Sequence, residues 1–184
     1  MTRALLVAAY LGAMNVARTR LGVPEAASGR AYLPALAGGS LLALGEVAAL
    51  AAWSGPLLRA LQITAETFRI AAGITAVLAA AYVLIVPRPS PEPVPGGWWA
   101  ALWPVCFPLL AGPELMAMAV ATGTREGVPS TLAAAGASLA VLLVLGALPR
   151  RRLADRVLLW SARLLGLVLL VVGLWLAVDG IRDV

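Results

Sequence analysis

The sequence predicts an all-α integral membrane protein with six transmembrane helices, arranged as two inverted three-helix repeats whose broken helices lie near the midplane of the membrane. Hydrophobic residues make up 61% of the 184, only 12% are charged, and the mean hydropathy is +0.92. A soluble domain of this size does not have this balance. Six apolar segments follow one another along the chain, and short motifs recur between its two halves.

The six apolar segments are each expected to form one span, because a membrane helix needs roughly 17–25 residues. They cover residues 4–17, 33–53, 70–86, 98–121, 131–148 and 157–178. Only the first falls short of this length. We therefore expect it to form a short or discontinuous membrane helix.

A proline-rich connector separates the third segment from the fourth. Residues 87–97 contain five prolines, which favour neither helix nor sheet and predict a stiff, extended linker. The connector divides the chain into a first three-helix repeat, residues 1–86, and a second, residues 98–184. Trp98, Trp99 and Trp103 open the fourth segment, as expected for aromatic side chains at a membrane interface.

Two pairs of motifs indicate that the halves are copies of one another. Residues 19–24 and 124–129 share five of six residues at an offset of 105. The Phe-Arg-Ile-Ala-Ala-Gly sequence at 68–73 corresponds to Ala-Arg-Leu-Leu-Gly at 162–166. A repeat of three spans crosses the membrane an odd number of times, so the second copy must enter from the opposite side. Such a pair is expected to place its binding site near the midplane.

The distribution of arginine sets the expected orientation. The first, third and fifth loops hold eight arginines, including Arg18 in the first loop, against five on the other face, and Arg163 falls inside the sixth segment. Because the basic side stays in the cytoplasm, both termini are predicted to be extracytoplasmic in the cell (inner) membrane. The net charge of +5 therefore indicates loops that face the anionic lipid bilayer, and no nucleic-acid partner is expected.

The residue inventory excludes several kinds of site. The chain has no histidine, all 14 basic residues are arginine, and Cys106 is the single cysteine. This excludes zinc clusters, haem ligation by histidine, disulfides, Walker-type phosphate loops, Schiff bases and Ser-Lys dyads. No metal site and no cofactor are expected, and the chain is predicted not to be an enzyme. The weakest hypothesis is an intramembrane enzyme that uses Glu46 and Glu114 as paired acids.

The main candidate site is the interruption of the fourth segment by Gly112-Pro113, followed by Glu114. Proline and a carboxylate within an apolar span need partners away from lipid, so the break is predicted to line a polar cavity. The alternatives are a packing kink at Gly112-Pro113 and a Glu114 that only caps the following helix. Asn15 is the residue of the first repeat that corresponds to Glu114. It is either a ligand at a similar helix break or a simple C-cap.

Three further charged residues are candidates. Glu46 lies past the middle of the second segment, where a lone carboxylate is costly and suggests function. Alternatively, Glu46 pairs with Arg69 or Arg163, or is protonated, and serves only to fix packing. Arg69 and Arg163 start helices from opposite sides in equivalent positions. They are either anchors that reach the membrane interface or a pair that supports the site.

Residues 107–114, Phe-Pro-Leu-Leu-Ala-Gly-Pro-Glu, resemble the P-x-x-A-G-P-G element of the MarC family of bacterial and archaeal inner-membrane proteins. Residues 55–73 resemble that family's G-x-x-L…I-S…F-R-I-A-G-G block, and residues 163–166 and 178–181 resemble its R-L-x-G and N/D-G-I closing helix. Asn15 matches the first residue of its N-P element. Val16 stands where the family element has proline, and Glu114 stands where the family element has a small residue. The resemblance implies a six-helix transporter of small neutral amino acids.

The leading hypothesis is a secondary transporter or exporter of a small polar solute, such as a neutral amino acid, coupled to a proton or Na+. Asn15 and the break at Gly112-Pro113-Glu114 would hold the solute near the midplane while the repeats rock. Glu114 would repel anions and select a cation or a zwitterion through its ammonium, or it would be protonated and carry the coupling proton. The alternative is a non-transport scaffold or accessory subunit of a membrane complex. The oligomeric state is left open.

Overall fold

The computed structural model describes residues 2–22, 33–86, 98–147 and 155–184, and every regular element in these ranges is a helix. The prediction of an all-α membrane protein is confirmed. In chain order the elements are α1 (Arg3–Met14), α2 (Val16–Gly22), α3 (Leu33–Ala60), α4 (Ala65–Ile85), η2 (Ala101–Leu110), α5 (Pro113–Glu126), α6 (Val128–Ala147) and α7 (Asp155–Asp183).

Four of these helices are long and apolar enough to cross a membrane by themselves: α3, α4, α6 and α7. The helices η2 and α5 provide a fifth candidate span that is bent by 69° at its break. The first predicted segment is divided into two short helices, α1 and α2. The structure therefore holds four to five candidate spans in its described residues, and the count of six stays a prediction.

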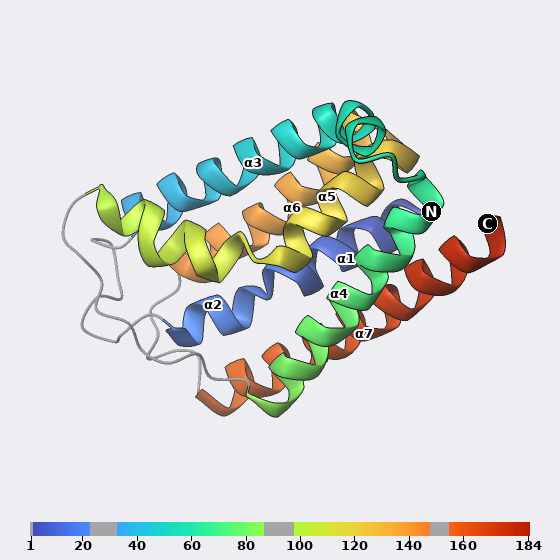
Figure 1. Cartoon of the computed structure of the whole chain (residues 1–184). Helices are drawn as coiled ribbons and strands as arrows, with labels where there is room; N and C mark the ends of the chain where they lie inside the picture. The colour runs from blue at the N-terminus through green and yellow to red at the C-terminus, as the bar shows by residue number, and fades with distance from the viewer. Residues whose placement is uncertain (1, 23–32, 87–97, 148–154) are drawn as a thin grey trace.

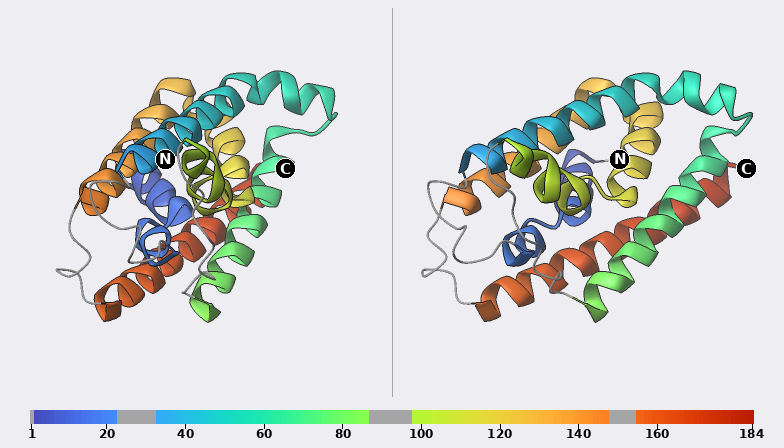
Figure 2. Two further views of the ribbon diagram at one scale, coloured as in Figure 1. Left: turned by 90° about the vertical axis from the view of Figure 1, so that its left-hand side faces the viewer. Right: turned by 60° about the vertical axis from the view of Figure 1, so that its left-hand side comes forward.

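The helices form two groups around a central α1 (Figures 1 and 2). One group is the pair α4 and α7, which pack against each other along most of the length of α4. The other contains α3, which packs on α5, α6 and η2. Tyr10 and Met14 of α1 are fully buried and belong to the main hydrophobic core. This core draws side chains from both halves of the sequence.

Glycines allow α4 and α7 to approach closely in an antiparallel arrangement. A Cβ atom on Gly73 would lie 2.5 Å from the carbonyl oxygen of Gly173, and one on Gly180 would lie 2.8 Å from that of Glu66. Gly166 faces Val83 near the other end of the pair. Without hydrophobic driving force in lipid, such close backbone packing is the usual source of helix association.

The helices extend beyond the apolar segments that the sequence predicts. Helix α3 continues through Gly55-Pro56 to Ala60, and α4 begins at Ala65, where the side chain of Thr64 accepts a hydrogen bond from the backbone N–H of Thr67 (3.2 Å). Helix ends are set by such caps, whereas hydropathy reports only the length that suits lipid. The predicted end of the second segment at residue 53 is thus seven residues short.

Both chain termini lie at the same end of the molecule, and α2 and α4 end toward the opposite end (Figure 1). This agrees with an even number of membrane crossings. The proline-rich connector at 87–97, the last two residues of the first repeat motif at 23–24 and five of the eight arginines of the first, third and fifth loops lie outside the described residues. The three-part division of the chain therefore stays a prediction.

Candidate functional site

The first helix break lies at Asn15, between α1 and α2. Its backbone is left-handed (φ 34°, ψ 69°), a conformation that asparagine tolerates better than most residues. The Asn15 Oδ1 atom accepts a hydrogen bond from the backbone N–H of Arg18 (3.1 Å), and its Nδ2 atom donates to the Ala162 carbonyl oxygen of α7 (3.0 Å). Asn15 is thus the C-cap of α1, as one interpretation expected, and it also ties the break to α7.

The second break lies between η2 and α5. Trp103 and Phe107 have extended backbone angles within η2, because each precedes a proline, which disfavours the helical conformation of the residue before it. The chain becomes helical again at Pro113, with Gly112 in the N-cap position. Proline suits this first position because the missing N–H would have no helical partner there. The predicted discontinuity at Gly112-Pro113 is present in the structure.

Glu114 lies in the first turn of α5, and its carboxylate folds back over Gly112. A Cβ atom on Gly112 would lie 2.5 Å from the Glu114 Oε1 atom, so a glycine is needed for this side-chain conformation. Arg18, which carries a positive charge, lines the same cavity as this carboxylate. Negative charge is also favourable at a helix N-terminus. The capping interpretation of Glu114 therefore agrees with its geometry, and it does not remove Glu114 from the cavity.

Both breaks border one cavity of about 610 Å³. Asn15 and Arg18 line it from the first half of the chain, and Gly112, Pro113 and Glu114 line it from the second. The C-terminal ends of α1 and η2, the C-terminal half of α4 and one residue of α7 complete the walls. The structure thus brings together four of the five predicted substrate-binding residues, from positions about 100 residues apart in the sequence.

Arg18 is a cavity residue that sequence analysis assigned to a loop. It lies in α2, and its guanidinium carbon is 5.0 Å from the centre of the Tyr82 ring of α4. Its Nε atom is buried and has no hydrogen-bond partner among the described residues. The available signal was spacing, because Arg18 follows Asn15 by three residues and so lies within the first turn after the break.

Glu46 does not join this cavity. It borders a separate groove on the outer side of α3, together with Trp53, Pro56 and Leu57. Neither Arg69 nor Arg163 forms an ion pair with it. In the part of the chain that the structure describes, both arginines thus have other partners, and the role of Glu46 stays a prediction.

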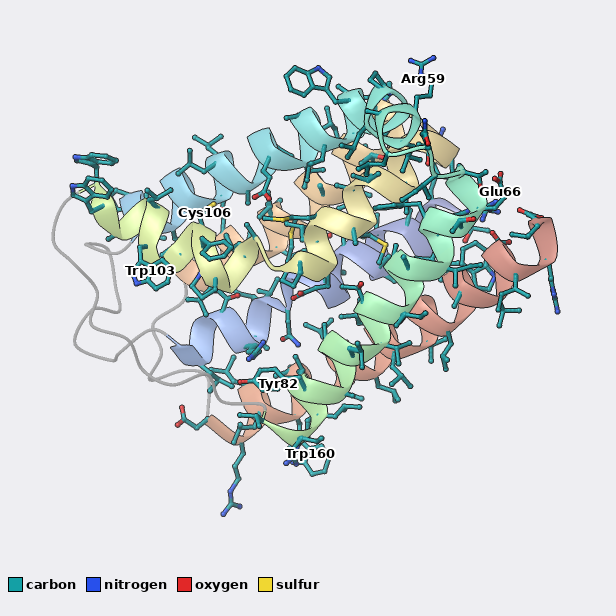
Figure 3. All side chains as sticks on the ribbon, viewed as in Figure 1. Arg59, Glu66, Tyr82, Trp103, Cys106 and Trp160 are labelled. Carbon is teal, nitrogen blue, oxygen red and sulfur yellow. The ribbon has the colours of Figure 1, made fainter. Side chains whose placement is uncertain are left out.

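Arg69 and Arg163 also lie away from the cavity, in different environments. Arg69 is 7% exposed and donates hydrogen bonds to Asp179 and Asp183, at 2.7 Å each. Arg163 is exposed, with its guanidinium carbon 5.6 Å from the centre of the Trp160 ring. Trp160 and Tyr82 lie toward the opposite end of the α4–α7 pair from Glu66, a neighbour of Arg69 (Figure 3). The two arginines thus differ in their partners.

Comparison with protein families adds a second line of evidence. The family model described as "MarC family integral membrane protein" matches residues 40–184. The chain belongs to the MarC family. The match includes the break at Gly112-Pro113 and both members of the α4–α7 pair, and it begins after the break at Asn15. No match was found among curated proteins or among solved structures.

Proposed function

We propose that this MarC protein is a secondary transporter or exporter of a small polar solute, such as a neutral amino acid. The observation that carries the proposal is that both helix breaks, at Asn15 and at Gly112-Pro113, border the same cavity. Broken helices near the midplane expose backbone polar groups that intact helices satisfy internally. A cavity of about 610 Å³ is within the usual size range for small-molecule sites.

The same arrangement supports a six-span protein built from two inverted repeats. Each half begins with a broken element, α1 with α2 or η2 with α5, and continues with two long helices. The third helices of the halves, α4 and α7, pack antiparallel across Gly73 and Gly173. Antiparallel packing of equivalent helices is expected for copies of opposite topology. In this proposal α1 and α2 together form the sixth span.

The charged groups of the cavity suit a zwitterion. Arg18 supplies a guanidinium with an unpaired, buried Nε–H, and Glu114 supplies a carboxylate. Arg18 would bind the carboxylate of an amino acid, and Glu114 would bind its ammonium group. The apolar side chains of Leu78 and Tyr82 border the same space and would contact a small uncharged side chain.

Membrane orientation and coupling follow from the arginine distribution and from Glu114. Both termini would be extracytoplasmic in the inner membrane, with the arginine-rich loops in the cytoplasm. Rocking of one helix group against the other would expose the cavity alternately, driven by a proton or Na+ gradient. Among the residues that line the cavity, Glu114 carries the carboxylate that would bind the coupled proton.

Solute uptake into proteoliposomes tests the proposal. Purified protein is first screened against amino acids for ligand-dependent thermal stabilisation, and each stabilising solute is then supplied to vesicles with an imposed proton or Na+ gradient. We expect uptake above protein-free vesicles, with strong loss in Arg18→Gln and Glu114→Gln. Arg163→Gln is the matched control, because that side chain lies outside the cavity. Absence of both stabilisation and uptake for every solute would favour a scaffold role.

A further inference from the structure

A network of ion pairs joins three helices at the end of the molecule that holds the chain termini. Arg69 of α4 donates to Asp179 and Asp183 of α7, and it lies 3.6 Å from Glu66. Arg125, in the last turn of α5, donates to the same Oδ2 atom of Asp179. One carboxylate of α7 is therefore shared by guanidinium groups from α4 and α5.

The two arginines of this network differ in how freely they can separate from Asp179. The Arg69 side chain is 8% exposed and has three acidic neighbours, so it is held firmly between α4 and α7. The Arg125 side chain is 28% exposed, and its further contacts are Glu126 of its own helix (3.3 Å) and the Trp175 ring, 4.9 Å away. Arg125 is thus the more exposed of the two arginines that bind Asp179, with fewer acidic neighbours.

The network lies on the side of the cavity that faces the termini. Glu114 borders the cavity at the start of α5, and Arg125 is eleven residues later, about 16 Å along a helix. The cavity reaches α4 only from Thr75 onward, whereas Arg69 is in the first turns of that helix. Figure 3 shows Glu66, which neighbours Arg69, at the end of α4 away from Tyr82.

The helices between the cavity and the network are closely packed. Gly73 and Gly173 meet where α4 crosses α7, and a Cβ atom on Gly123 of α5 would lie 2.6 Å from the Ala51 Cα atom of α3. Among the residues that line the cavity, none belongs to the network. On the termini side of the cavity, α5 therefore packs against α3 and α4, and the Arg125–Asp179 contact ties its C-terminal end to α7.

We propose that the contact between Arg125 and Asp179 is an ionic latch that keeps the cavity closed on the side of the chain termini. The proposal rests on the proposed alternation of access to this cavity. When the latch opens, the C-terminal end of α5 moves away from α7, while Arg69 continues to hold α4 and α7 together through Asp183. The α4–α7 pair then acts as one body against which α5 swings.

Labelling of a cysteine in the cavity measures the closure directly. Ala79→Cys lines the cavity and is made in a Cys106→Ala background, so that it is the single thiol. An impermeant thiol reagent is applied to membranes of known sidedness. Val184→Cys, at the exposed C-terminus, identifies the termini side, and Arg156→Cys, exposed near the start of α7, identifies the other side. Sidedness is therefore measured and does not depend on the predicted orientation.

The latch predicts a change in labelling from one side. Loss of a charged hydrogen bond worth about 1.5 kcal/mol changes an equilibrium by about tenfold. In the Arg125→Gln variant, the thiol introduced by Ala79→Cys should therefore react about tenfold faster with reagent applied from the termini side. Its reaction with reagent applied from the other side should be slower. Arg125→Lys keeps the charge and should stay near the parental rate. Arg125→Met serves as a second variant if Arg125→Gln does not give a cooperative thermal transition.

The matched control is Arg182→Gln, which removes an equal charge at the same end of the molecule, from an exposed side chain of α7. It should label at the parental rate. Parental labelling of both Arg125→Gln and Arg125→Met, or an equal increase in Arg182→Gln, would overturn the latch. No solute is present in this labelling assay, so its result does not depend on whether transport is detected. Conversely, a result that overturns the latch does not contradict the proposed transport.

Discussion

Substitution of Gly73 by alanine tests the close packing of α4 against α7 without any assumption about function. A methyl group at this position would lie 2.5 Å from the Gly173 carbonyl oxygen and 2.6 Å from the Ala177 backbone nitrogen. Both neighbours are backbone atoms of a long helix, so neither can move aside as a flexible side chain would. The helices must therefore separate along their length.

The expected cost follows from overpacking. Inserting a methyl group into a well-packed interface typically costs about 1–3 kcal/mol. For a protein of this size, each kcal/mol lowers the melting temperature by roughly 2–4 °C. Gly73→Ala should thus melt roughly 2–12 °C below the parent protein.

The matched control is Gly136→Ala in α6, where an added Cβ atom meets no heavy atom within 4 Å. Alanine is favoured over glycine within a helix by about 0.5–1 kcal/mol, so this variant should melt at or slightly above the parental temperature. The same detergent, protein concentration and scan rate are used for all three proteins, with intrinsic tryptophan fluorescence as the signal. Equal melting temperatures for Gly73→Ala and Gly136→Ala would contradict the antiparallel α4–α7 contact.

Three further predictions concern the breaks and the topology. Asn15→Ala removes the hydrogen bonds to Arg18 and Ala162 and places alanine in a left-handed conformation, so it should lower the free energy of unfolding by about 2–3 kcal/mol. Asn15→Gly should lower it by less in the same denaturant titration, and equal losses would contradict the strained cap. Glu114→Gln should abolish pH-driven uptake but keep solute exchange if Glu114 carries the proton, and Glu114→Gly should admit anions if it sets charge preference; unchanged uptake in both would leave Glu114 as a helix cap only. Reporters fused after Val184 should be active outside the cytoplasm, and a cysteine placed in residues 87–95 should resist an impermeant reagent on intact cells; rapid labelling there would reverse the proposed orientation.

Local chemistry explains what the sequence by itself determined. Apolar composition predicts membrane helices wherever it persists for the thickness of a bilayer. A proline after glycine interrupts a helix at a definite residue, because proline lacks the N–H donor and fixes φ. The break at Gly112-Pro113 was therefore predictable to the residue, and the break at Asn15 was indicated by its place in the first repeat. These signals act within a few residues and need no knowledge of distant segments.

The tertiary structure alone decided which of these local features meet. Sequence analysis placed Arg18 in a loop, and only the packing of α2 against α7 and η2 brings it over the Tyr82 ring of α4 and into the cavity. Glu46 has the residue type of a buried site, yet the orientation of α3 turns it toward a separate groove. Arg69 and Asp179 are 110 residues apart in the sequence. They form an ion pair only because α4 and α7 pack against each other at their glycines. Contacts between long helices depend on small differences in packing summed over many residues, and this sum is not contained in any local stretch of the chain.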